Sequence, residues 1–255
     1  MAILSQLEYR FNLFTDAVIQ PVLTGLIEVT IWSAILASTA TGTLAGFSRA
    51  SYLAYALWAA FFARISTNWM YEFKMLEEIE TGTVNSILSR PISFYEYYLG
   101  QFIGYKILTT VFSFIVPISV VLVISGPTQL SRLPLACATL LVYLVFVHTV
   151  SFSIASLGFF FNRIYSLTMA KNIALWVLSG EFFPLDLVPD PFRNIMIHLP
   201  FSNAVYIPVG YITGRFDETL VFQGLVSTMI GIVVMGAIGN VLWTAGRRRY
   251  SGTGA

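Results

Sequence analysis

Long runs of apolar residues restrict what this chain can fold into more than any other feature of its sequence. Crossing the bilayer core of roughly 30 Å takes about 20 helical residues, and six stretches approach or exceed that length. Transmembrane β-strands would be short and would alternate polar with apolar residues, which these runs do not. We therefore predict an all-α integral membrane protein, a single domain over 1–255 with six transmembrane helices. The predicted spans are 21–40, 52–69, 102–124, 133–161, 166–183 and 220–245.

The composition supports a membrane protein and excludes other classes. Hydrophobic residues make up 56% of the chain and charged residues 11%, with a mean hydropathy of +0.76. A soluble monomer could not cover so much apolar surface. The net charge of +1 provides no basic face for phosphates, so we expect no nucleic-acid partner. A single cysteine, Cys137, excludes an internal disulfide.

The distribution of Lys and Arg predicts the orientation, because loops rich in these residues stay in the cytoplasm. An even number of spans puts both termini on one side. If that side is the cytoplasm, nine Lys and Arg lie inside, and Arg64 sits near the inner end of a span. For Arg64 and Lys106 we expect side chains that reach out to the inner headgroups. Four arginines are then predicted outside: Arg49, Arg132, Arg193 and Arg215.

The first nineteen residues have apolar side chains at spacings of three and four. This pattern predicts an interfacial helix over 1–19 that lies flat on the membrane and turns into the first span at Pro21. An early extension of the first span is the alternative. A cleavable signal is not expected, because no basic region precedes the apolar run.

A polar segment follows the second predicted span. Residues 70–98 contain seven of the 27 charged residues of the chain. Within it, Val84, Ile87, Leu88 and Pro91 lie at helical spacing on one side, which is typical of an amphipathic helix. Such a helix at the water boundary can offer one face to a soluble partner. We predict that 70–98 is a cytoplasmic coupling segment with a helix at about 81–90.

Five of the ten prolines lie in a second unusual segment, 184–216. One straight helix cannot contain them. We predict a re-entrant hairpin of two short helices in the outer leaflet, broken by the Pro-Asp-Pro turn at 189–191, since irregular backbone is tolerated there only when protein or a wet cavity surrounds it. An extracellular loop is the alternative, but residues 195–211 are strongly apolar for an exposed loop.

The motifs for common chemistries are absent from the sequence. It contains no Gly-x-x-x-x-Gly-Lys-Ser/Thr loop, no His-Glu-x-x-His helix, no Cys/His cluster and no Gly-x-Ser-x-Gly elbow. We therefore expect no catalytic residue, no metal site and no nucleotide site on this chain. His148, within the fourth span, is expected to bond to a neighbouring helix.

Two acidic residues fall in or beside predicted spans, where ionisable groups are costly and often functional. Glu28 lies near the middle of the first span, and Glu181 lies where the fifth span meets the proline-rich segment. Both are candidates for a translocation pathway. For Glu28, a carboxyl group that holds two helices together is an equally weighted reading; Glu181 could also reach the outer interface.

The order of these parts resembles the membrane subunit of an ABC-2-type transporter, the permease of a type V ABC exporter, over essentially the whole chain. The basic tail is similar to that of a bacterial permease subgroup formerly described as a domain of unknown function. The stretches that carry the resemblance are Glu80-Thr81-Gly82-Thr83, Leu88-Ser89-Arg90-Pro91-Ile92-Ser93, Leu199-Pro200-Phe201-Ser202, Tyr206-Ile207-Pro208 and Gly246-Arg247-Arg248-Arg249-Tyr250-Ser251.

This resemblance implies an export permease in the bacterial inner membrane, with both termini in the cytoplasm. Its partners would be cytoplasmic ABC ATPase subunits, which hold ATP and Mg²⁺, and a second permease subunit, identical or related. No cofactor is implied on this chain. The apolar side of the coupling helix would fill a groove on the ATPase. The coupling residues would be Glu80, Thr81, Gly82, Val84, Ile87, Leu88, Arg90 and Pro91.

Two other functions remain open from the sequence. An ion-driven secondary transporter would show broken helices in both halves, whereas only the second half has one. A membrane-embedded lipid-modifying enzyme would need convergent acid, base and nucleophile or metal ligands. Residues 70–98 contain carboxylates but neither His nor Cys.

Overall fold

The computed structural model describes residues 11, 14–38, 46–113, 128–161 and 164–250. These residues form helices joined by turns, which confirms the predicted all-α class. The helices are α3 (Gln20–Ser38), α4 (Arg49–Ser66), α5 (Trp69–Thr81), α6 (Asn85–Leu88), α7 (Phe94–Ser113), α9 (Leu133–Ala155), α10 (Tyr165–Leu178), α11 (Asp190–His198), α12 (Tyr206–Ile212) and α13 (Glu218–Arg249).

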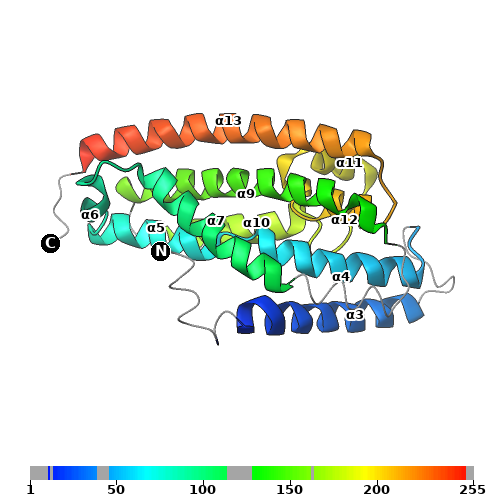
Figure 1. Cartoon of the computed structure of the whole chain (residues 1–255). Coiled ribbons are helices and arrows are strands. Elements are labelled where there is room, and N and C mark those ends of the chain that lie inside the picture. The colour runs from blue at the N-terminus through cyan, green and yellow to red at the C-terminus, as the bar shows by residue number, and fades with distance from the viewer. Residues whose placement is uncertain (1–10, 12–13, 39–45, 114–127, 162–163, 251–255) are drawn as a thin grey trace.

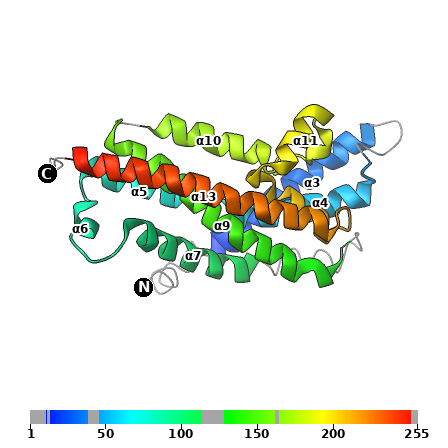
Figure 2. The same ribbon diagram turned by 90° about the horizontal axis from the view of Figure 1, so that it is seen from above.

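The long helices run along one common axis, as Figures 1 and 2 show. Helices α9 and α13 lie side by side and share the most extensive contact in the described part of the chain. Helices α4 and α5 follow one another along the bundle, and α3 packs on α4. The short helix α6 lies at the end of the bundle where α13 ends, and α11 and α12 lie at the opposite end.

Close packing of α13 depends on glycines that face its neighbours. A Cβ atom at Gly246 would lie 2.5 Å from Cδ2 of Phe159, and one at Gly239 would lie 2.6 Å from the hydroxyl of Ser153. No side chain fits at such distances, so these two positions allow α13 to approach α9 and the turn that follows it.

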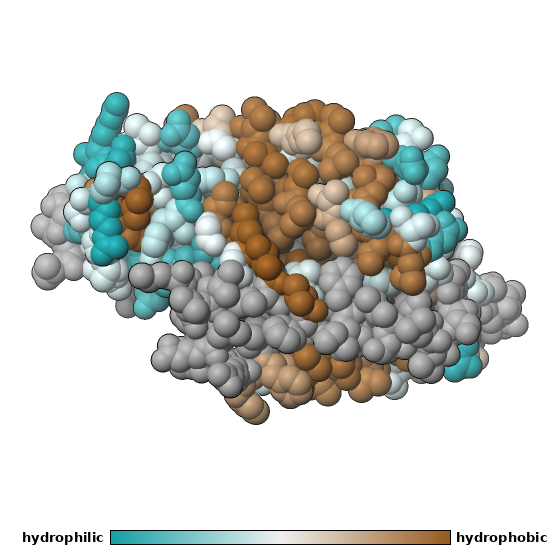
Figure 3. Space-filling view, in the orientation of Figure 1, coloured by the Kyte–Doolittle hydropathy of each residue, from teal (hydrophilic) through white to brown (hydrophobic). Residues whose placement is uncertain are grey.

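Three helical stretches are long and apolar enough to cross a bilayer: Ala17–Ser38, Leu130–Phe159 and Glu218–Arg249. They match the first, fourth and sixth predicted spans. Helix α4 is 18 residues long and contains two arginines, α10 has 14 residues, and the predicted span 102–124 runs into 114–127, outside the described residues. These three spans remain predictions. In Figure 3, apolar side chains form a band across the middle of the visible face, with polar side chains at both ends.

The predicted turn at Pro21 does not occur. The backbone is helical from Phe14 through Ser38, with one π-helical turn at Thr15–Ile19. In that turn the N–H of Gln20 donates to the carbonyl of Thr15, five residues back. This wider turn lies directly before Pro21, which has no N–H to donate, so the helix continues past the proline. The alternative, an early extension of the first span, fits the described residues, while 1–10 and 12–13 of the predicted interfacial helix lie outside them.

The proline-rich segment contains two short helices, α11 and α12, but the predicted break at 189–191 is wrong. Pro191 instead lies in the first turn of α11. A proline fits there because the first N–H groups of a helix have no partner within it. The chain breaks between the helices at 199–205, where one 3₁₀ turn, Pro200–Asn203, intervenes.

Candidate functional site

The predicted coupling segment, residues 70–98, is built from α5, α6 and the start of α7. Helix α5 ends at Thr81 because Gly82 follows in the left-handed conformation, with φ of 79°. Glycine takes this conformation without steric cost and commonly ends helices. Helix α6 then covers only Asn85–Leu88. The predicted continuous helix over 81–90 is therefore wrong.

The apolar side of the coupling segment packs inward. Val84 is 0% exposed and Ile87 is 5% exposed, both within the hydrophobic core, and Leu88 packs partly against that core. The expectation that these side chains fill a groove on a partner must therefore be corrected for Val84 and Ile87. Within residues 80–91, Gly82 is buried, and the residues that face outward are Glu80, Thr81, Thr83, Asn85, Ser86, Ser89, Arg90 and Pro91.

Two contacts fasten the coupling segment to the bundle. The ammonium of Lys171 in α10 forms an ion pair with the carboxylate of Glu72 in α5, and the two side chains are 10% and 0% exposed. At the start of α7, Phe94 stacks on Trp243 of α13, with ring centroids 4.8 Å apart, and Tyr98 is buried beside Phe94. Burial, together with the nearby carboxylate of Glu78, raises the pKa of Tyr98, which keeps its phenol neutral.

A second candidate site is a polar cluster inside the bundle, formed by Glu28, Lys106 and Glu181. Lys106 in α7 is buried, and its ammonium donates to the carbonyl of Arg64 in α4, 2.9 Å away. Glu181 lies within electrostatic range of two groups: the ammonium of Lys106 attracts its carboxylate, and the carboxylate of Glu28 in α3 repels it. Because Lys106 points into the bundle, the expectation that it reaches the headgroups is wrong.

A cavity of about 230 Å³ adjoins this polar cluster. Helix α3 contributes Thr24, one turn from Glu28, and Glu181 itself lines the space. The mixed polar and apolar walls can accommodate several water molecules or a small polar group. The lining residues are Gln20, Thr24, Ala60, Ala63, Arg64, Thr67, Trp176 and Glu181.

His148 is fully buried in α9, and its Nε2 lies 3.1 Å from the carbonyl oxygen of Tyr95 in α7. This contact confirms the expected bond to a neighbouring helix. Among the described residues, no group of three or more His, Cys, Asp or Glu is arranged to hold a metal ion.

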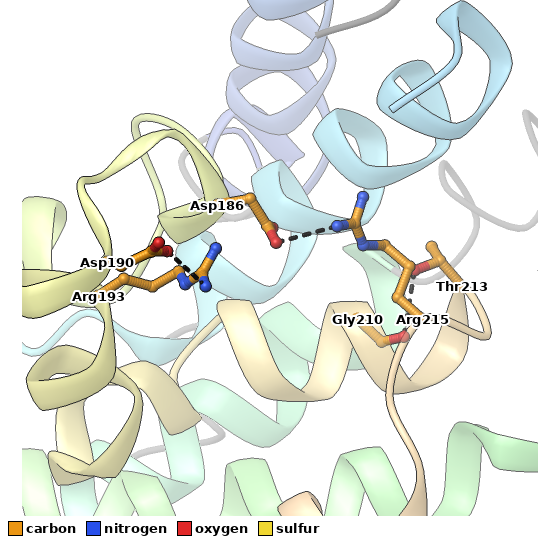
Figure 4. A network of polar contacts seen from close by, with 6 residues as sticks. All are labelled: Asp186, Asp190, Arg193, Gly210, Thr213 and Arg215. Carbon is orange, nitrogen blue, oxygen red and sulfur yellow. Dashed lines mark hydrogen bonds and ion pairs between the residues drawn. The ribbon is translucent and has the colours of Figure 1, made fainter. Parts of the chain in front are cut away.

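Arginines hold together the end of the bundle that carries α11 and α12. Arg215 pairs with Asp186 at 3.0 Å, and its guanidinium carbon lies 3.4 Å from the centroid of the Phe47 ring. In Figure 4 the two charged groups point toward one another from different segments. Arg132 donates to the carbonyls of Tyr211 and Phe216, at 3.0 and 2.8 Å. The sequence did not predict the partners of these arginines, and their location outside the membrane remains a prediction.

A family model described as ABC-2 family transporter protein matches residues 22–254. The chain belongs to the ABC-2 transporter family. Comparison with curated proteins and with solved structures gave no match. Membership in the ABC-2 family confirms the resemblance seen in the sequence and favours a transport subunit over an enzyme.

The fold of this ABC-2 family chain brings one set of predicted site residues together and divides another. Glu28 in α3 and Glu181 in the chain after α10, far apart in the sequence, lie within electrostatic range of one another. The coupling residues split into a buried group and an exposed group. Lys106 was missed as a member of the polar cluster, although an ammonium within an apolar run is the kind of signal that marks such a site.

Proposed function

We propose that this chain is the permease subunit of an ATP-driven ABC-2 exporter, working in a bacterial inner membrane with both termini in the cytoplasm. The observation that carries the proposal is the family match over residues 22–254, in a chain without a P-loop motif. Separate ABC ATPase subunits would hold ATP and Mg²⁺, and a second permease subunit, identical or related, would complete the pathway.

The exposed polar face of the coupling segment supports a role in docking the ATPase. Thr81, Ser86 and Arg90 face outward, while Val84 and Ile87 attach the segment to the bundle. A force applied to the outer face would thus reach the core directly. It would also pass through α5 to α10, because Glu72 and Lys171 join these helices.

The polar cluster supports a role in the translocation pathway. Glu28, Lys106 and Glu181 place ionisable groups between helices beside a cavity of about 230 Å³. Ionisable groups at such positions are costly, and they typically line the route of a substrate or ion. Glu28→Gln should reduce export more than it reduces membrane assembly. Equal loss of both would show that Glu28 only holds helices together.

Docking can be tested with a matched pair of substitutions. Ser86→Trp adds bulk to the exposed face of α6, and Asn194→Trp adds the same bulk to an exposed site on α11 at the other end. We expect Ser86→Trp to abolish co-purification with the ATPase while leaving the chain in the membrane. Asn194→Trp should co-purify normally. Normal co-purification and export by Ser86→Trp would contradict the assignment, and so would export by the purified chain alone under an ion gradient.

A further inference from the structure

A cleft of about 660 Å³ lies between the start of α7, α9 and the second half of α13. It shares Arg90 and Pro91 with the outward face of the coupling segment, and it contains no residue of the polar cluster. Its volume is within the range of small-molecule sites. Its lining residues are Leu88, Arg90, Pro91, Ile92, Ser93, Phe94, Tyr95, Thr149, Phe152, Ile232, Gly236, Asn240, Trp243, Thr244 and Arg247.

The polarity of the cleft lining changes along α13. On α13 it runs from Ile232 to Arg247, which is about 22 Å at the helical rise of 1.5 Å per residue. Ile232 and Gly236 form an apolar end, and Asn240 and Thr244 introduce polar groups before the basic end is reached. A ligand that fills this space is apolar at one end and polar at the other.

The polar end of the cleft carries positive charge. Arg90 and Arg247 both line it, and none of the lining residues is acidic. Within the described part of the chain, neither arginine forms an ion pair, and Asn240 and Thr244 form no side-chain hydrogen bonds. Two guanidinium groups flanked by an amide and a hydroxyl are suited to a phosphate.

Packed aromatic side chains line the cleft beside these polar groups. Trp243 stacks on Phe94 with centroids 4.8 Å apart and contacts Phe152 at 5.3 Å. Tyr95 is held by Thr149, whose hydroxyl lies 2.8 Å from the phenol oxygen. Tryptophan is characteristic of the boundary between headgroups and acyl chains, where one edge of the ring meets water.

We propose that this cleft binds an anionic phospholipid from the leaflet on the side of α6. The phosphate would lie between Arg90 and Arg247, the headgroup would contact Asn240 and Thr244, and an acyl chain would extend past Gly236 toward Ile232. Basic pockets between helices on the cytoplasmic side are known to select anionic headgroups. The inference goes beyond transport, because lipid retention by the purified chain does not require an ATPase.

The charge requirement can be tested on the purified full chain in detergent, with phosphatidylglycerol and phosphatidylcholine as probes and native mass spectrometry as the readout. Arg247 and Arg248 both lie in the last turn of α13, but only Arg247 lines the cleft. Arg247→Gln should weaken retention of phosphatidylglycerol by about tenfold or more, since it removes a charge-assisted contact. Arg248→Gln should have less than about a twofold effect.

A second matched pair of substitutions tests whether the ligand needs the open space of the cleft. Among the described residues, a Cβ at Gly236 would meet only Cγ2 of Thr149, at 3.8 Å, so Gly236→Leu should fold and project a side chain into the cleft. Ala237→Leu adds the same side chain at the next residue, which is exposed outside the cleft. We expect Gly236→Leu to lose phosphatidylglycerol and Ala237→Leu to keep it, with equal melting temperatures.

Three results would overturn the proposal. The first is equal retention of phosphatidylglycerol and phosphatidylcholine. The second is equal behaviour within both matched pairs. The third is displacement of phosphatidylglycerol by the same concentration of glycerol 3-phosphate, which would show that the cleft takes a soluble phosphate.

Discussion

Removing the ammonium of the buried ion pair should destabilise the chain strongly. In Lys171→Met, the carboxylate of Glu72 stays fully buried without its partner. Its second oxygen already has no hydrogen-bond partner in the described part of the structure. Leaving such a charge uncompensated costs about 3–5 kcal/mol. At about 2–4 °C per kcal/mol for a chain of this size, the melting temperature should fall by about 6–20 °C.

Two control variants distinguish the cost of the unpaired Glu72 charge from a general loss of packing. In Glu72→Met/Lys171→Met the charge is gone and side-chain volume is similar, so most of the lost stability should return. Arg193→Met breaks an exposed pair with Asp190, whose side chain is 76% exposed, and should cost at most about 1 kcal/mol. Tryptophan fluorescence in detergent at one scan rate measures all three. Equal shifts for Lys171→Met and Arg193→Met, or no recovery in the double variant, would refute this reasoning.

Two further predictions concern the packing of the bundle. Gly246→Leu should destabilise the chain by about 1–3 kcal/mol because its Cβ would overlap Phe159. Gly100→Leu should be tolerated, since no atom of the described residues lies within 4 Å of a Cβ there. Paired melting curves test this, and equal curves would contradict it. Arg215→Met should leave Asp186, whose side chain is 14% exposed, without its partner and make residues 184–216 more sensitive to added protease. Unchanged cleavage would show that the pair contributes nothing to this end of the bundle.

The parts of the fold that could be predicted are those governed by local composition. Helices α9 and α13 agree with the predicted spans 133–161 and 220–245 to within a few residues at most ends, because their apolar runs are long and uninterrupted. The family could also be anticipated from the order of apolar and polar segments. The contact of His148 with α7 followed from the need of a buried imidazole for a partner.

The remaining features depend on contacts between distant segments. Periodicity showed that Val84 and Ile87 share a side, but it could not show whether the chain itself or a partner covers them. The left-handed conformation of Gly82 shortened a helix that the same periodicity had extended. Lys106 was assigned to the headgroups because the carbonyl that its ammonium contacts, that of Arg64 in α4, lies far away in the sequence.

The hydrogen bonds of Arg132 connect three helices at the end of the bundle that carries α11 and α12. Arg132 directly precedes α9. Its guanidinium donates to the carbonyl of Tyr211 at the end of α12 and to that of Phe216 just before α13. The N–H of Gln129 adds a third link, to the carbonyl of Ile212 at 2.8 Å. These three hydrogen bonds join α9, α12 and α13 at that end. We therefore expect a pathway for cargo to open along another helix interface, such as that of α3, which packs chiefly on α4.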